Sequence, residues 1–319
     1  MERSHETLVT VACPICGGGN HIRIKHVLPH VWHQAADSGA YEIRWCDSCE
    51  YGFLWPRPAS DRLASFYGEH YFTAYGDERV SCDRQGFGAR LLAHLAWRLD
   101  RSQSILHVIA AGTRVCDIGC GNGDLLATLR ECGHEVVGVE PDEAARRRAG
   151  DKGLTVYAGT AEHLPRELLG KRFDVVMLNH TLEHCSSPEE ALRSGRDILV
   201  PGGILAVTVP NNACTYAERS GTSWFHCDAG RHLNFFTQKS LSLLCRRAGF
   251  TVQQAFFEGA IGPFLPDRWR SERQVWDALH PGPNVPRPSS VGQWATFVRT
   301  MFAPRERRYE VLGILANPA

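Results

Sequence analysis

Four cysteines near the start of the sequence have the spacing of a metal site. They form two Cys-x-x-Cys pairs, Cys13 with Cys16 and Cys46 with Cys49. Four such thiolates can close a tetrahedral shell around Zn²⁺, and because no fifth ligand is evident we expect a structural metal. Each pair is followed by a glycine, Gly17 or Gly52, which we expect to allow a tight turn towards sulfur. The alternatives are four unrelated reduced cysteines or a redox motif.

A glycine-rich loop is the second candidate for chemistry. In the run VCDIGCGNGD, Asp117 precedes Gly119, Gly121 and Gly123 between a predicted strand and a predicted helix. Glycines at such a place let a ligand approach the backbone beside a helix N-terminus. The spacing differs from the Gly-x-Gly-x-x-Gly pattern of dinucleotide sites. A carboxylate there repels a pyrophosphate but attracts an ammonium group, so the loop predicts a cationic, nucleotide-like ligand.

Glu140 ends the next predicted strand. A carboxylate at this position can accept both hydroxyls of an adenosine ribose. An adenosine joined to an amino acid satisfies both carboxylates, and S-adenosylmethionine is such a molecule.

A third group follows the fourth predicted strand of this region: His180, Glu183 and His184. If the ligand is S-adenosylmethionine, its sulfonium methyl is already a good electrophile, and a protein that transferred it would chiefly have to align the acceptor and remove the acceptor's proton. In a helical turn the three side chains would share one side. His232 and His226 are further candidates, and we rank His184 and His232 above His180 and His226. The alternative is a hydrogen-bonded turn without catalytic function.

The elements that must position these residues alternate between strands and helices. This alternation is typical of βαβ units and of a doubly wound parallel sheet. A helix is predicted at 238–248. Strands are predicted at 114–118, 135–139, 154–157, 173–178, 204–209, 252–257 and 309–316. We expect a zinc ribbon at 1–58, a helical linker or lid at 59–110, and a ligand-binding domain at 111–319 with an insertion at 263–304.

Composition narrows the classes of partner. Lys and Arg together number 35, as do Asp and Glu, so there is no general attraction to nucleic acid or to anionic lipid. No segment approaches 18 uninterrupted apolar residues, and no stretch resembles a signal peptide. Most of the 12 cysteines are scattered, as reduced core residues are. We expect a cytoplasmic protein with no membrane partner, and a homodimer is left open.

Five segments between about 105 and 260 resemble, in order, the motifs of class I S-adenosylmethionine-dependent methyltransferases. They are VCDIGCGNGDLL, VVGVEPD, GTAEHLP, FDVVMLNHTLEH and LVPGGILAVTVPN. The resemblance implies an α/β fold with a Rossmann-like, doubly wound, seven-stranded sheet. It also implies cofactor contacts from Asp117, Gly119, Gly121 and Gly123 to methionine, from Glu140 to ribose, from Ala161 and Glu162 to adenine, and from Asn179 at the end of the fourth strand. Many relatives have Asp where this chain has Thr160.

The run from His180 to His184 resembles the Glu-x-x-Glu-His pattern of ubiquinone-pathway O-methyltransferases and small-RNA 2'-O-methyltransferases. In those enzymes the pattern holds a divalent cation. Here His180 replaces the first Glu. The resemblance implies Mg²⁺ or another divalent cation, which would lower the pKa of an acceptor hydroxyl.

A zinc ribbon joined to this domain resembles bacterial methyltransferases of sugar, surface-glycan and natural-product pathways. The first expectation is therefore O- or C-methylation of a small molecule. The second is an RNA methyltransferase that binds its substrate through the ribbon, as some ribosomal-RNA guanine methyltransferases also carry a zinc module, although the arginine clusters are short. The third is an inactive cofactor-binding scaffold. Aromatic residues expected to line an acceptor pocket are Trp224, Phe225, Phe264, Trp269 and Trp276.

Overall fold

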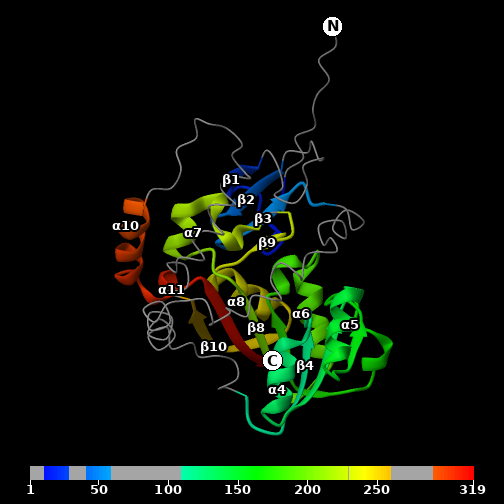
Figure 1. Cartoon of the computed structure of the whole chain (residues 1–319). Helices are drawn as coiled ribbons and strands as arrows, with labels where there is room; N and C mark the ends of the chain where they lie inside the picture. The colour runs from blue at the N-terminus through cyan, green and yellow to red at the C-terminus, as the bar shows by residue number, and fades with distance from the viewer. Residues whose placement is uncertain (1–10, 29–40, 59–108, 229, 260–289) are drawn as a thin grey trace, which may run out of the picture.

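The computed structural model describes residues 11–28, 41–58, 109–228, 230–259 and 290–319 (Figure 1). Nearly all of the expected linker at 59–110 and most of the insertion at 263–304 lie outside the described residues. So do three of the expected pocket aromatics, Phe264, Trp269 and Trp276, and the side chain of Phe225.

The larger of two sheets has the seven strands that the resemblance implied. Its order is β10-β11-β8-β7-β4-β5-β6. Six strands run in the same direction, and β11 runs antiparallel to them between β8 and β10. The order reverses between β4 and β7, where ligands bind in folds of this type. The bounds are β4 Arg114–Ile118, β5 Glu135–Glu140, β6 Val156–Ala158, β7 Phe173–Asn179, β8 Leu199–Pro210, β10 Phe250–Glu258 and β11 Val311–Pro318.

Helices cover both faces of this sheet, so its strands are apolar on both sides, as is usual for parallel sheets. On one face the buried side chains of α6 and α8 pack with Cys116 and Val207. On the other face, Leu129 of α4 packs with Val115 and Ala206. Two helices have clear starts: Asp142 caps α5 and a Thr237–Ser240 capping box starts α8. The bounds are α4 Asp124–Glu131, α5 Glu143–Asp151, α6 Pro188–Asp197 and α8 Gln238–Arg247.

The smaller sheet combines strands from two distant parts of the chain. Strands β1 (Ile22–Leu28), β2 (Tyr41–Cys46) and β3 (Tyr51–Trp55) form an antiparallel meander that carries the cysteines, and we call described residues 11–58 the cysteine module. Its fourth strand, β9 (Asn234–Phe235), comes from the C-terminal half of the chain and pairs with β3 (Figure 1). The cysteine module therefore shares a sheet with the rest of the protein and is not a separate appendage.

One glycine of the cysteine module has a different role from the one we expected. Gly17 has φ +71° and makes the turn of the first Cys-x-x-Cys pair, as predicted. At the second pair the left-handed residue is Glu50, with φ 54°. Gly52 lies within β3, where an added Cβ would be 2.9 Å from both the Phe235 Cβ and the Trp45 ring. Gly52 is therefore required by the close packing of β9 and not by a turn.

Short elements complete the described chain. The ones that matter for the site are η3 (Leu182–His184), after β7, and η5 (Phe225–Cys227), which precedes β9. Helix α7 (Thr215–Ser220) contacts α10 (Ser290–Met301) and α11 (Arg305–Arg308). Also present are η2 (Arg166–Leu168) and η4 (Gly221–Ser223). Among the described helices, none has the length and apolar character needed to cross a membrane.

Candidate active site

The glycine loop connects the carboxyl end of β4 to α4, at the edge where the strand order reverses. Gly119, Gly121 and Gly123 have φ values of +79°, +54° and +78°, which only glycine adopts without strain. A Cβ at Gly119 would also collide with the side chain of Thr181. The Thr181 hydroxyl donates to the Ile118 carbonyl at 3.0 Å, so the loop is packed directly against the turn that follows β7.

Asp117 is buried beneath this loop without a compensating partner. It is 2% exposed, and within the described chain its Oδ1 atom has no hydrogen bond. Burial, and then the charge of Glu140, raise the pKa of Asp117 to about 8. An unpaired buried acceptor costs about 1–3 kcal/mol. A cationic ligand group placed against Oδ1 would remove that penalty, which fits the ammonium group of a methionine moiety.

Glu140 ties the glycine loop to the next strand. Its Oε2 atom accepts from the Gly121 amide and its Oε1 atom from the Asp142 amide, both at 2.9 Å. Burial raises the pKa of this carboxyl, and the two amides oppose that shift. Each carboxylate oxygen has a second lone pair, so Glu140 can accept ribose hydroxyls while keeping both amides.

The other predicted cofactor residues lie along the same edge. Ala161 is buried. The Oε1 atom of Glu162 accepts from the amides of Ser186 and Ser187 at 2.8 and 3.3 Å, so this carboxylate fixes the start of α6. Contact of Glu162 with adenine stays a prediction. At the end of β7, Asn179 Oδ1 accepts a hydrogen bond from the Thr208 hydroxyl of β8.

On the acceptor side, Glu183, His184 and His232 converge. One ligand atom from each lies within 4.8 Å of the others, and the two imidazole centroids are 4.7 Å apart. The Nδ1 atoms of His184 and His232 lie 3.1 and 2.9 Å from the carbonyls of Arg231 and His226. Because a carbonyl only accepts, both Nδ1 atoms carry hydrogen, and the Nε2 atoms carry the lone pairs.

The charges of this cluster suit a cation. Burial alone would raise the pKa of Glu183, but the hydrogen bond from His180 and the nearby imidazoles outweigh it, so the pKa lies below its usual range. Burial, then the charge of His232, lower the pKa of His184 to about 4. Glu183 is 1% exposed, and no described residue bonds to its Oε2 atom. A carboxylate and two imidazoles in this state can hold a divalent metal ion.

His180 and His226 form a second, adjoining pair. The Nδ1 atom of His180 lies 3.3 Å from Glu183 Oε1, and its ring stacks on that of His226 at 6.1 Å. His180 has φ 52°, an uncommon conformation for a residue other than glycine. Neither histidine belongs to the compact set of Glu183, His184 and His232. The structure therefore brings together the two histidines that the sequence ranked first.

Asn234, which the sequence analysis quoted only as part of a motif, holds this cluster in place. Its Nδ2 atom is within hydrogen-bond distance of three carbonyls of the turn after β7: Leu182 at 3.2 Å, Glu183 at 3.3 Å and Cys185 at 2.7 Å. The side chain is 1% exposed. The Glu183 carbonyl also accepts from the Leu233 amide at 2.8 Å and the Leu182 carbonyl from the Cys185 amide at 3.3 Å, so the side chain of Asn234 is one of several donors that hold this turn.

The oxygen of the same amide is bound by the cysteine module. Asn234 Oδ1 accepts from the Tyr51 hydroxyl at 2.5 Å and from Arg57 Nη2 at 2.8 Å. Arg57 also donates to the Ser186 carbonyl at 3.1 Å. Tyr51 and Arg57 were not predicted, since their side chains reach Asn234 only through the pairing of β3 with β9. Position within a Pro-Arg-Pro run was the only sequence signal for Arg57.

The four module cysteines are gathered as the spacing predicted. One sulfur from each of Cys13, Cys16, Cys46 and Cys49 lies within 4.8 Å of the others, and the Cys16 and Cys46 sulfurs are 3.8 Å apart. Burial raises the pKa of the Cys13 thiol to about 11. A bound cation favours the thiolate, so this arrangement fits Zn²⁺.

Comparison with known proteins agrees with this geometry. A family described as "Methyltransferase domain" matches residues 84–255, more than half of the chain. With its strand order and glycine loop, the chain belongs to the class I S-adenosylmethionine-dependent methyltransferases.

Curated relatives include ubiquinone biosynthesis O-methyltransferases. The protein from Ruegeria pomeroyi is 38% identical over 113 residues, which cover 34% of this chain and 45% of that protein. The one from Azorhizobium caulinodans is 37% identical over 172 residues, covering 50% and 66%. The chain therefore spans roughly half to two thirds of the length of these two relatives.

Solved structures show more distant similarity. One is the 1,6-didemethyltoxoflavin-N1-methyltransferase of Burkholderia thailandensis with bound S-adenosylhomocysteine. It is 16% identical, covers 90% of this chain and 98% of its own, and has a TM-score of 0.45. An S-adenosylmethionine-dependent methyltransferase from Archaeoglobus fulgidus is 20% identical with coverages of 72% and 94% and a TM-score of 0.45.

The raised pKa of Asp117 predicts a proton release on ligand binding. At pH 7 the free protein holds this carboxyl mainly protonated, and an ammonium group beside it would favour the ionised form. Binding of S-adenosylhomocysteine should release roughly one proton at pH 7 and less above pH 8. Calorimetry in buffers of different ionisation enthalpy measures this number.

Asp117→Asn should abolish that release and weaken binding. The control is Asp174→Asn, since Asp174 lies at the start of β7 and bonds to Arg114. An unchanged proton count in Asp117→Asn would remove Asp117 from the ligand site.

The amide of Asn234 predicts a large stability effect. Asn234→Ala removes the acceptor of the Tyr51 hydroxyl and of Arg57 and the donor to the Cys185 carbonyl, and should lower the free energy of unfolding by about 2–4 kcal/mol, measured by urea denaturation. Asn317→Ala is the control, because Asn317 also donates to two carbonyls but at a more exposed edge, and should cost under about 1 kcal/mol. Equal effects of the two substitutions would contradict the role assigned to Asn234.

Proposed function

We propose that this protein transfers the methyl group of S-adenosylmethionine to a hydroxyl of a small-molecule acceptor. The observation that carries this proposal is the placement of two groups at one edge of the sheet. The unpaired Oδ1 atom of Asp117 suits the cofactor, and the cluster of Glu183, His184 and His232 suits an acceptor hydroxyl.

Residues of the glycine loop would bind and orient the cofactor. Asp117 would pair with its ammonium group, the left-handed glycines would admit it close to the backbone, and Glu140 would accept its ribose hydroxyls. When bound, S-adenosylmethionine supplies an electrophilic methyl group on a sulfonium. Alignment of the acceptor with the carbon–sulfur bond then accounts for much of the acceleration.

The histidines would take the proton of the acceptor. The bound cofactor would supply its methyl group to the acceptor oxygen and would keep the electron pair of the carbon–sulfur bond, so this chain has only the hydroxyl proton to remove. The hydroxyl proton would pass to the Nε2 atom of His232, since burial lowers the pKa of His184 to about 4 and makes His184 a weak base. Glu183 would stabilise the positive charge that develops on the imidazole.

A divalent cation fits the same residues. Glu183 Oε2 and the Nε2 atoms of His184 and His232 would bind it in place of the acceptor's proton, so with a cation present these histidines would be ligands and not the base. The cation would lower the pKa of the acceptor hydroxyl, whose proton would then pass to solvent. Two imidazoles and one carboxylate favour a first-row transition ion over Mg²⁺, which prefers oxygen ligands.

The acceptor class is supported by the relatives and by charge. The curated relatives are named O-methyltransferases, which favours oxygen as the acceptor atom, and a sugar or natural-product intermediate is compatible with the cysteine module. The RNA alternative needs a basic face, yet several arginines of the short clusters are engaged. Arg247 pairs with Glu189, Arg307 with Glu218, and Arg146 donates to the Glu140 carbonyl.

The cysteine module would hold a structural Zn²⁺ through its four thiolates. Its function would be to keep β2 and β3 in the conformation that presents Tyr51 and Arg57 to Asn234. The metal would thus support the acceptor side from a distance and take no part in the transfer.

Methyl transfer can be measured by incubating the protein with labelled S-adenosylmethionine and a host-cell extract divided into small-molecule, RNA and protein fractions. We expect label in the small-molecule fraction, and stimulation by Mn²⁺ or Co²⁺ greater than by Mg²⁺. Glu183→Gln should lower the rate about 100-fold at unchanged affinity for S-adenosylhomocysteine. The control is Glu131→Gln, on the exposed end of α4.

The outcomes separate the alternatives. Label in RNA would favour the RNA methyltransferase. Cofactor binding without label in any fraction would indicate a scaffold.

Zinc dependence of the fold is tested by Cys46→Ser. Because structural zinc supplies folding free energy, the variant should lose bound zinc and unfold at a lower temperature than the unchanged protein. Elemental analysis and thermal unfolding measure both. Cys132→Ser, an exposed thiol after α4, should retain both properties. If the wild-type protein is stable without bound zinc, the zinc assignment is refuted.

A further inference from the structure

Helix α10 presents its apolar side to solvent. Trp294, Val298 and Phe302 are spaced by four residues, so they lie on one side of the helix. Phe302 follows the last residue of α10, and its amide donates to the Val298 carbonyl at 3.3 Å, so the helical turn continues to it. The exposed fractions of the three residues are 61%, 51% and 86%. They form a continuous apolar surface, which we call the α10 stripe, on the outside of the molecule (Figure 1).

The opposite side of α10 carries polar residues and faces inward. Thr296 and Thr300 are 3% and 1% exposed, and α10 packs on α7. The Thr296 hydroxyl donates to the Gly292 carbonyl at 2.8 Å, while within the described chain Thr300 Oγ1 has no hydrogen-bond partner. A helix on the surface of a globular protein normally has the reverse arrangement, with its apolar side against the core. Packing within the described chain therefore does not account for the apolar residues of α10.

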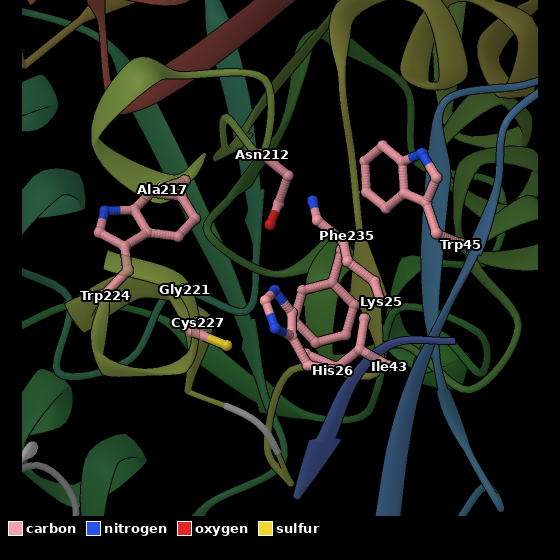
Figure 2. A pocket seen from close by; sticks show the side chains of 10 residues that line it. All are labelled: Lys25, His26, Ile43, Trp45, Asn212, Ala217, Gly221, Trp224, Cys227 and Phe235. Carbon is pink, nitrogen blue, oxygen red and sulfur yellow. The ribbon is translucent and has the colours of Figure 1, made fainter. Parts of the chain in front are cut away.

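Aromatic side chains at another boundary of the fold show the usual arrangement. Where the cysteine module meets residues 212–235, the rings of Trp45, Trp224 and Phe235 lie close together (Figure 2). These three residues are only 7%, 2% and 2% exposed. The exposure of the α10 stripe is thus a local feature and not a general property of the aromatic residues in this protein.

Basic residues adjoin the α10 stripe. Residues 290–308 include four arginines and one glutamate, a net charge of +3, whereas the whole chain is neutral. Arg307 pairs with Glu218 of α7. Arg305 is exposed, and the side chain of Arg299 is 65% exposed although its Nη2 atom is 4.0 Å from Glu218. Exposed apolar patches with a polar rim mark sites of contact with proteins or membranes.

The charge beside the α10 stripe decides between these two kinds of partner. A second copy of this chain, docked through the same surface, would bring its own arginines against these, and like charges repel. An anionic lipid bilayer offers acyl chains to the apolar stripe and phosphate groups to the arginines. With 12 residues α10 is too short to cross a bilayer, but a helix that lies in the interface needs only one apolar side.

We propose that α10 and α11 form a surface that docks reversibly on an anionic lipid bilayer. Trp294, Val298 and Phe302 would enter the boundary between headgroups and acyl chains, and Arg299 and Arg305 would contact lipid phosphates. The attraction is local, so it is compatible with the neutral charge of the whole chain. This inference goes beyond the proposed methyl transfer and does not depend on it.

Co-sedimentation of the full-length protein with lipid vesicles tests this proposal. One preparation contains phosphatidylcholine alone, and the other contains phosphatidylcholine with phosphatidylglycerol. We expect a partition coefficient about tenfold higher on the vesicles with phosphatidylglycerol, because each arginine near an anionic surface adds to the attraction. High salt should reduce this preference by screening the charges. Failure to bind the anionic vesicles, or equal binding to both preparations, would overturn the proposal.

The double substitution Trp294→Ser with Phe302→Ser removes both aromatic rings of the α10 stripe. It should lower the partition coefficient on the anionic vesicles about tenfold or more, since less apolar area enters the bilayer. Because both side chains are exposed, the thermal unfolding temperature should stay unchanged. The control is Leu169→Ser, which should leave vesicle binding unchanged, because Leu169 is 75% exposed but follows η2, away from α10 in the sequence.

Two results with these variants would contradict the proposal. Undiminished binding of the double variant to anionic vesicles would remove the α10 stripe from the contact. A wild-type dimer that the double variant converts to a monomer, measured by light scattering, without vesicle binding by either protein, would assign the stripe to a second copy of the chain.

Discussion

The side chain of Asn234 satisfies three carbonyls of the turn between β7 and α6, while two residues of the cysteine module bind its oxygen. The turn carries Glu183 and His184. Its Leu182 and Glu183 carbonyls also accept backbone amides, whereas the Cys185 carbonyl receives the shortest bond from Asn234, and a buried carbonyl left unsatisfied would cost about 1–3 kcal/mol. The acceptor side therefore lies at the edge of the large sheet and is held by residues of the cysteine module. The cysteine module precedes the catalytic domain in the sequence, yet in the fold it is part of that domain.

Burial gives the carboxyl groups along the sheet edge different properties. Asp117 has no donor on Oδ1, and its pKa is raised to about 8. Glu183 is as deeply buried, yet the hydrogen bond from His180 and the imidazoles around it lower its pKa. One carboxyl thus awaits a cation from the ligand, whereas the other is already ionised among histidines. This difference separates a cofactor side from an acceptor side within one edge of the sheet.

Features encoded in short stretches of sequence were predictable. The strands around the glycine loop follow from the alternation of apolar runs, and the position of Asp117 follows from its spacing to the glycines. The extent of β8 was underestimated, because Pro201, Gly202 and Gly203 conceal its beginning at Leu199. Asn234 belongs to a strand of two residues, too short to leave a periodic pattern. In β1 the register with β2 shifts between Ile24 and His26, and because this bulge depends on the pairing of two strands it has no local sequence signal.

The proximity of His184 to His232 illustrates the same limit. A resemblance of local motifs suggested both, but only the pairing of β9 with β3 and the amide of Asn234 bring the two segments together. Contacts between distant segments arise from packing, so the residue types alone could not show which three side chains form the candidate metal site. Gly52 was similarly assigned to a turn, although the close approach of Phe235 explains it.

The dependence of the acceptor side on the cysteine module is tested most directly by hydrogen exchange, measured by mass spectrometry before and after a chelator removes zinc. Protection of β2 and β3 should fall, and protection of residues 182–185 and 233–235 should fall with it, while β4 and β5 stay protected. Loss of protection confined to the cysteine module, with residues 182–185 unchanged, would contradict the account.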